Sequence, residues 1–312
     1  MEAQASRLGR ARSGAVSPEA FSRFALAALA ALFLVVVTGA IVRLTASGLG
    51  CENWPRCGET PFPEKDFHAL VEFGNRVVAL FAMAATAVSA FAARRVAGLP
   101  RWVARVAAAA AAATVAQIPL GGLTVIFELH PLLVMGHFLL ALAGVALAVV
   151  AAVGARVTAC GLERERVPRG LRWLAYALVP LAAAVVVTGA LVTAAGPHSG
   201  GEDIRRLGDL VGAAYVHVRV TAVFGVAFAV VVVALHRLRV RLTEERAVAM
   251  GVLVVVLGQM AVGEIQWRNE LPWWLVLAHV ALATAVWTGV VALAALVRLR
   301  ESAMAGPARP LP

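Results

Sequence analysis

The sequence predicts an all-α polytopic membrane protein in which eight transmembrane helices form two four-helix bundles related as parallel repeats. Of its 312 residues, 61% are hydrophobic and only 15% are charged, a composition that soluble proteins of this length do not have. Eight segments are apolar over the roughly 20 residues that a helix needs to cross the hydrocarbon core. Parts of the first half recur in the second half, which indicates a duplicated architecture.

The apolar segments follow one another with short connections. The basic and polar residues 1–23 precede the first segment, and no small-residue cleavage site follows it, so we expect a retained helix and not a removed signal peptide. Only the letters FELHP separate the third segment from the fourth, which makes this boundary the least distinct. The segments cover roughly residues 24–43, 68–92, 102–126, 131–154, 173–194, 211–234, 248–266 and 272–297.

The net charge of +10 is a topology signal and does not indicate nucleic-acid binding, because the basic residues follow alternate loops. By the positive-inside rule, both termini lie in the cytoplasm of a multi-pass protein of the cell membrane. Attraction to anionic membrane lipid is a secondary consequence. Twenty of the 28 Lys and Arg residues lie in the predicted cytoplasmic segments, which are residues 1–23, 94–105, 156–172, 237–246 and 298–312.

Two pairs of segments define the internal repeat. VVVTGAIV at 35–42 recurs as VVVTGALV at 185–192, an offset of 150 residues. QIPLGGLTVIFELHPLLVMGH, which ends at residue 137, aligns with QMAVGEIQWRNELPWWLVLAH, which ends at residue 279, an offset of 142. The first outer loop is therefore eight residues longer than its counterpart. We expect five regions: a cytoplasmic tail (1–23), a first half (24–155), a cytoplasmic linker (156–172), a second half (173–297) and a second tail (298–312).

Three histidines occupy one depth in the predicted bundles. His137, His217 and His279 each lie six or seven residues into a helix, about 10 Å below the outer surface. Subtracting the 142-residue offset from position 217 leads to Asn75. Histidines on facing helices at one depth suit axial ligation of a haem; zinc is less favoured because it prefers four ligands. The alternative is that each histidine only donates an interhelical hydrogen bond.

Arginines lie near this level. Arg76, Arg219 and Arg43 could pair with the propionates of a haem in the outer leaflet. The alternative, which is strongest for Arg43, is that these side chains extend to lipid headgroups.

Glu72, Asn75 and Arg76 share one helix face because they are spaced three and four residues apart. Glu72 either neutralises Arg76 or exchanges a proton or stabilises a developing cation. The second interpretation is favoured because the repeat counterpart of Glu72 is Ala214. An amide is a poor iron ligand, so the first half offers only His137 and an open position, whereas the second half offers a closed site suited to electron transfer.

Two of the three cysteines lie in the long outer loop. Cys51 and Cys57 flank ENWPR and match a structural or redox-active disulfide in an oxidising compartment, with metal binding as a third alternative. Cys160 lies in a cytoplasmic loop without an assigned role.

These motifs together resemble the haem A synthases. The resemblance rests on TGAIVRLTASGLGCENWPRCG, VEFGNR, LGGLTV, TGALVTAAGPHSG and the helical histidines, in order over residues 24–297. It implies oxidation of the C8 methyl of haem O to a formyl group by successive hydroxylations, giving haem A for cytochrome oxidase. It also implies haem b bound by His217 and His279, haem O near His137, Glu72 as the acid of that site, Cys51 and Cys57 as the loop cysteines, and a haem O synthase as partner. The family pattern Glu-x-x-His-Arg is here Glu72-Phe-Gly-Asn75-Arg76.

Two other functions compete with this one. A membrane cytochrome that only passes electrons would explain the histidines but neither the asymmetry at positions 72 and 75 nor the cysteine loop. A transporter would need helices broken near the middle of the membrane, for which Pro119 and Pro180 are the candidates.

Overall fold

A computed structural model describes residues 15–51, 54–58, 62–63, 65–161, 166–201, 204–238 and 242–304. All eight predicted segments are helical, and each helix is long and apolar enough to cross a membrane. Over the described residues the structure is all-helical, so the predicted fold class is confirmed. The helices are α2 (Pro18–Leu44), α3 (Phe67–Ala93), α4 (Arg101–Ile126), α5 (Pro131–Cys160), α6 (Arg169–Ala195), α7 (Leu210–Arg237), α8 (Thr243–Arg268) and α9 (Trp273–Met304).

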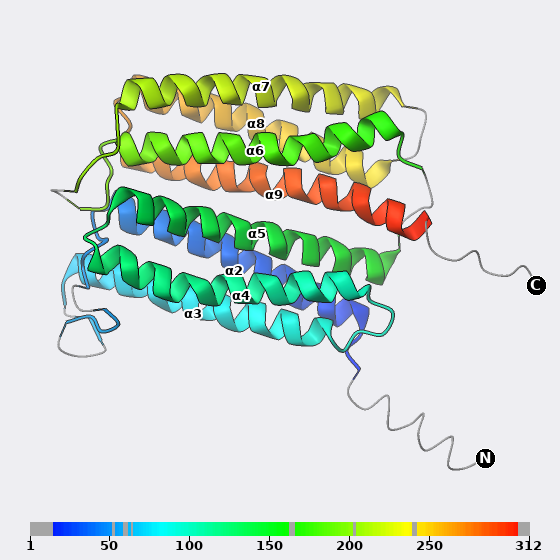
Figure 1. Ribbon diagram of the computed structural model, residues 1–312, viewed down its shortest axis with the longest axis horizontal. Coiled ribbons are helices and arrows are strands. Elements are labelled where there is room, and N and C mark those ends of the chain that lie inside the picture. Colours follow the sequence, from blue (N-terminus) through cyan, green and yellow to red (C-terminus); the bar gives the residue numbers. More distant parts are fainter. Residues whose placement is uncertain are drawn as a thin grey trace, which may run out of the picture.

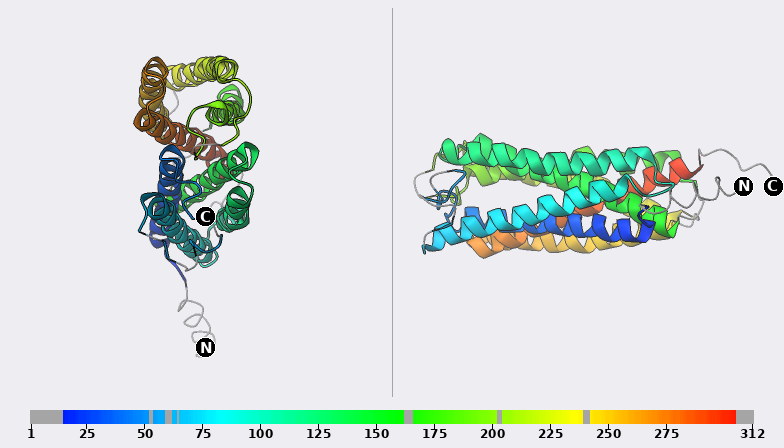
Figure 2. Two further views of the ribbon diagram at one scale, coloured as in Figure 1. Left: turned by 90° about the vertical axis from the view of Figure 1, so that its left-hand side faces the viewer. Right: turned by 90° about the horizontal axis from the view of Figure 1, so that it is seen from below.

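The helices form two bundles that lie side by side, and neighbouring helices within each bundle run antiparallel (Figures 1 and 2). In the first, α2 packs on α3, α3 on α4, α4 on α5, and α5 back on α2; in the second, α6 to α9 repeat this ring. The bundles meet through α2, α5, α6 and α9. At this junction the buried indole N–H of Trp287 donates to the carbonyl oxygen of Leu142 at 2.9 Å. The arrangement agrees with two parallel repeats.

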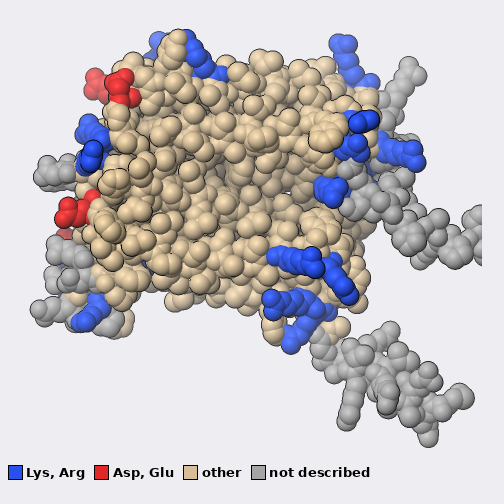
Figure 3. Space-filling model, viewed as in Figure 1, with Lys and Arg blue, Asp and Glu red and all other residues tan. Residues whose placement is uncertain are grey.

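Charged side chains gather at the two ends of the molecule and leave an apolar band between them (Figure 3). The start of α2 and the end of α9 lie at the same end of the bundles (Figure 1), which we call the inner end; the opposite end is the outer end. The first long loop, with its two cysteines, therefore lies at the outer end. Helix α5 continues to Cys160 and α6 begins at Arg169, so helix extends into both sides of the predicted linker.

Side-chain caps fix where several helices begin. Asp66 accepts hydrogen bonds from the N–H groups of His68 at 2.9 Å and Ala69 at 3.1 Å, which starts α3. The hydrogen bond from Ala69 holds the pKa of Asp66 below its usual range, so the cap is lost only when the pH falls below that lowered value. Helices α4 and α6 continue through Pro119 and Pro180, so neither is broken as the transporter hypothesis required.

The turns before α5 and α9 have the same unusual backbone. Glu128 and Leu129 have φ values of 48° and 57°, and their repeat counterparts Glu270 and Leu271 have 61° and 60°. Two successive non-glycine residues in the left-handed region are uncommon. The letters FELHP therefore do form a turn, and the repeat extends to loop conformation.

Candidate functional site

Four side chains on α3, α5, α7 and α9 each lie against a glycine of the preceding helix. A Cβ atom added to the glycine would lie 3.1–3.2 Å from Cε1 of the imidazole in three cases, and 3.9 Å from the amide oxygen in the fourth. Each imidazole thus rests on helix backbone that only glycine leaves open. The four positions are equivalent in structure, as the 142-residue offset predicts. The pairs are Gly39 with Asn75, Gly121 with His137, Gly189 with His217, and Gly263 with His279.

In the second half, a threonine contacts one of the two histidines. His217 Nδ1 lies 3.1 Å from Thr188 Oγ1, and the Thr188 hydroxyl lies 2.9 Å from the carbonyl oxygen of Ala184. Because the hydroxyl proton goes to that carbonyl, its oxygen accepts from Nδ1–H. This tautomer leaves the lone pair of Nε2 free. Helices α7 and α9 therefore carry His217 and His279 at equivalent positions, each against a glycine of the preceding helix.

The first half keeps the threonine but presents a different side chain. The Thr38 hydroxyl donates to Asn75 Oδ1 at 2.6 Å. Thr38 precedes Thr188 by the 150-residue offset, so both halves use the same contact at the same place. On α4, Gln117 donates through Nε2 to the carbonyl oxygen of His137 on α5 at 3.2 Å. The first half therefore offers one imidazole and one amide where the second half offers two imidazoles.

The residues of these sites fit a haem. Nδ1 of His137 and Nδ1 of His279 are buried and have no hydrogen-bond partner among the described residues. Buried polar atoms in proteins are normally paired, so such exceptions require an explanation. Imidazoles in an apolar bundle, resting on glycine backbone, are the donor set of axial haem sites. The glycine contacts let the rings lie close to the helix backbone.

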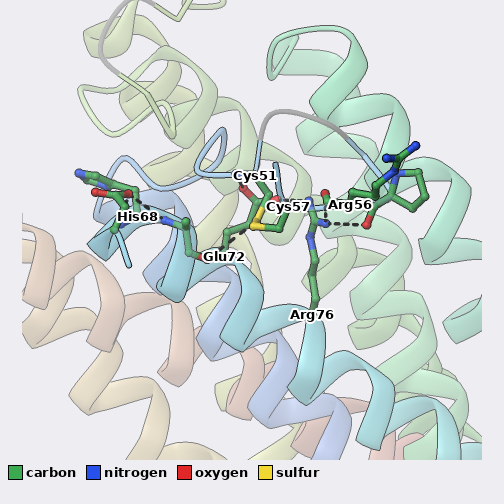
Figure 4. The surroundings of a disulfide bond; sticks show 9 residues. Cys51, Arg56, Cys57, His68, Glu72 and Arg76 are labelled. Carbon is green, nitrogen blue, oxygen red and sulfur yellow. Dashed lines mark hydrogen bonds and ion pairs between the residues drawn. A yellow bond between two sulfur atoms is a disulfide. The ribbon is translucent and has the colours of Figure 1, made fainter. Parts of the chain in front are cut away.

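Glu72 lies at the outer side of the first site and joins the cysteine loop to α3 (Figure 4). It is 6% exposed. Its Oε2 accepts from the Cys51 N–H at 2.9 Å, and its Oε1 accepts from Arg76 Nη2 at 2.5 Å. Arg76 Nη1 donates to the carbonyl oxygens of Pro55 and Arg56 at 3.2 and 3.1 Å. The pairing of Glu72 with Arg76 is therefore formed, and a role of Glu72 in proton exchange stays a prediction.

Cys51 and Cys57 form a disulfide, and both are buried. The loop that they close also reaches α4, because a Cβ added to Gly122 would lie 2.8 Å from the Trp54 ring. Trp54 thus connects the disulfide loop to α4 at the outer end of the first bundle. A redox role of this disulfide stays a prediction. Cys160 is a free, exposed thiol at the inner end.

Arg76, Arg219 and Arg43, the arginines expected to pair with haem propionates, each contact other groups of the protein. Arg219 is exposed, and its guanidinium lies 2.9 Å from the centroid of the Tyr215 ring. Arg43 donates through Nε to the carbonyl oxygen of His198 and through Nη2 to that of Thr193, both at 2.7 Å. Arg43 therefore ties the first half to the second, a role that neither sequence interpretation included.

Sequence reasoning missed the threonines and glycines that hold the ligand-position side chains. Their signal was nevertheless present, because Thr38-Gly39 and Thr188-Gly189 are the centre of the repeated VVVTGA motif. The repeat of this motif could have indicated that its threonines and glycines contact the side chains at positions 75 and 217.

Comparisons with known proteins agree with this architecture. The model of the COX15-CtaA family, described as a cytochrome oxidase assembly protein, matches residues 22–291. The chain is 43% identical over 65 residues to a heme A synthase of Symbiobacterium thermophilum, which covers 20% of this chain and 21% of that protein. It is 43% identical over 47 residues to a heme A synthase of Geobacillus kaustophilus, 15% of either chain. The aligned stretches thus span about a fifth or less of these relatives.

Proposed function

Since the chain belongs to the COX15-CtaA family of cytochrome oxidase assembly proteins, we propose that it is a haem A synthase. It oxidises the C8 methyl of haem O to a formyl group by successive hydroxylations and so supplies haem A for cytochrome oxidase. The observation that carries the proposal is the set of three imidazoles and one amide at four equivalent, glycine-backed positions. A pure electron carrier has no need for two halves that differ at this level.

In the second half, His217 and His279 would hold haem b as a resident cofactor. Bound there, haem b supplies one-electron transfer. Thr188 accepts a hydrogen bond from Nδ1–H of His217, which favours the tautomer with an unprotonated Nε2. Gly189 and Gly263 let both rings lie against helix backbone.

In the first half, His137 would hold haem O as substrate, and Asn75 offers only an amide, which is a poor iron ligand. A substrate with one protein ligand can bind and leave more readily than one with two. Glu72 lies one helical turn nearer the outer end than Asn75. Its carboxylate is buried and held by Arg76 and the Cys51 N–H. It is thus fixed in position to exchange a proton with the substrate or to stabilise positive charge beside it.

The proposal extends to orientation and partners. The arginine-rich inner end faces the cytoplasm with both termini, and the haem sites lie toward the outer face of the cell membrane. A haem O synthase delivers the substrate, and a separate electron acceptor takes the electrons released by the oxidation.

The first test is to purify the protein from a host that makes haem O, extract the bound haem, and identify it by chromatography and mass. Haem b together with haem A or its hydroxylated precursor supports the synthase. Haem b alone, with haem O available, favours a membrane electron-transfer cytochrome. Absence of any haem contradicts both.

Variants separate the two sites. His217→Phe and His279→Phe are expected to lose retained haem b, whereas Glu72→Ala keeps haem b and loses product. The readouts are haem b per protein and haem A formed. Retention of haem b by both histidine variants would contradict the assignment of His217 and His279 as its ligands.

A further inference from the structure

A pocket of about 350 Å³ opens at the inner end of the first bundle, far from the haem positions. It lies where α3 ends and α4 begins. Three arginine side chains and a floor of apolar residues line it: Arg94, Arg101 and Arg105, with Ala93, Val96, Leu99, Ala104 and Ala108. In the view of Figure 3, basic side chains gather at the lower right, over the ends of α3 and α4.

Within the described part of the chain, no carboxylate pairs with any of the three guanidinium groups. Each arginine is exposed, and none has a side-chain hydrogen bond or ion pair among the described residues. Arg101 and Arg105 are four residues apart on α4, so they share one helix face. The first turn of α4 contains no acidic residue, and no side chain caps it. The positive end of the α4 dipole adds to the potential of the arginines.

The second half provides an internal comparison. Helix α8 is the repeat counterpart of α4, and its first turn contains Glu244 and Glu245. Both carboxylates pair with Arg300 at 2.6 Å. The 142-residue offset places Trp102 and Val103 at the corresponding positions of α4. At this position the second half therefore pairs two carboxylates with one arginine, whereas the first half has three arginines around a pocket.

We propose that this pocket binds the headgroup phosphate of an anionic phospholipid of the cytoplasmic leaflet. The charge of the three arginines complements a phosphate, and Arg binds phosphate oxygens in a fork geometry. The apolar part of the lining, formed by Val96, Leu99 and Ala108, suits the start of an acyl chain. A free phosphate ion would gain nothing from contact with it. Basic pockets between helices on the cytoplasmic side are a known form of lipid recognition.

Lipid titration by native mass spectrometry of the full-length, haem-loaded protein tests the proposal. The probes are phosphatidylglycerol, phosphatidylcholine and inorganic phosphate. We expect selective binding of phosphatidylglycerol that weakens roughly 25-fold in Arg101→Gln/Arg105→Gln, because each basic residue near an anionic surface contributes about fivefold. The control is Arg156→Gln/Arg237→Gln, which removes two exposed arginines of the inner end that do not line the pocket.

Each other outcome overturns the proposal. An equal loss of affinity in the control variant means general attraction to surface charge and no site. Equal binding of phosphatidylcholine means that the arginines do not select the headgroup. Binding of inorganic phosphate to the wild type as strong as that of phosphatidylglycerol, at the same concentration, means that the pocket is an anion site without lipid specificity.

Discussion

At the residue scale, a single methyl group on α8 is expected to displace a haem ligand. Gly263→Ala places a Cβ 3.1 Å from His279 Cε1, and such overpacking costs about 1–3 kcal/mol. Haem b retention should fall roughly ten- to a hundredfold, measured as haem per protein after purification. Gly258→Ala is the control on the same helix, because its Cβ meets nothing within 4 Å. Equal haem loss in both variants would refute the glycine contact as the cause.

Asn75 sets the second residue-scale prediction. Asn75→His should give an imidazole beside Thr38, in the arrangement that His217 has beside Thr188. The first half then gains a second ligand, so the variant should hold haem O more tightly and release less haem A. The measurement is the low-spin haem signal in the optical and electron paramagnetic resonance spectra, which should rise toward two haems per protein. An unchanged spectrum would show that position 75 does not face the iron.

At the scale of the element, the junction of α8 with α9 depends on a buried ion pair. Arg300 is 1% exposed and donates to Glu245 Oε1 at 2.6 Å, and Glu245 is fully buried. Arg300→Leu leaves that carboxylate without its partner, which should lower the free energy of unfolding by about 3 kcal/mol. Glu245→Leu/Arg300→Leu removes both charges and should recover most of this loss.

The matched control is the ion pair of Arg268 with Glu264, also on α8. Its side chains are 75% and 61% exposed, so Arg268→Ala should cost less than about 1 kcal/mol. Thermal unfolding of the purified variants in one detergent compares them. Similar melting temperatures for Arg300→Leu and Arg268→Ala would contradict a stabilising role of the buried pair.

At the scale of the whole molecule, Cys160 reports the orientation of both bundles. It is a free, exposed thiol at the inner end, whereas Cys51 and Cys57 are joined in a disulfide. A membrane-impermeant maleimide should label the wild type in inverted vesicles and leave it unlabelled in intact cells. Lys65→Cys, at an exposed outer-loop position, should be labelled in intact cells as a positive control. Labelling of Cys160 from outside, absent in Cys160→Ser, would reverse the proposed topology.

The sequence by itself determined the eight helices, their pairing into two halves and the shared level of His137, His217, His279 and Asn75. These features follow from local physics, because a membrane requires apolar segments of about 20 residues whose backbone is bonded internally. Because the segments are duplicated, residues related by the repeat offset lie at equivalent depths in the two halves. The tertiary structure alone decided the partners of the polar side chains. Arg43 bonds carbonyl oxygens of the other half, Glu72 holds the disulfide loop, and Arg300 reaches Glu245 on another helix. Such contacts join residues far apart in sequence, and their energies depend on burial and geometry that no local pattern encodes.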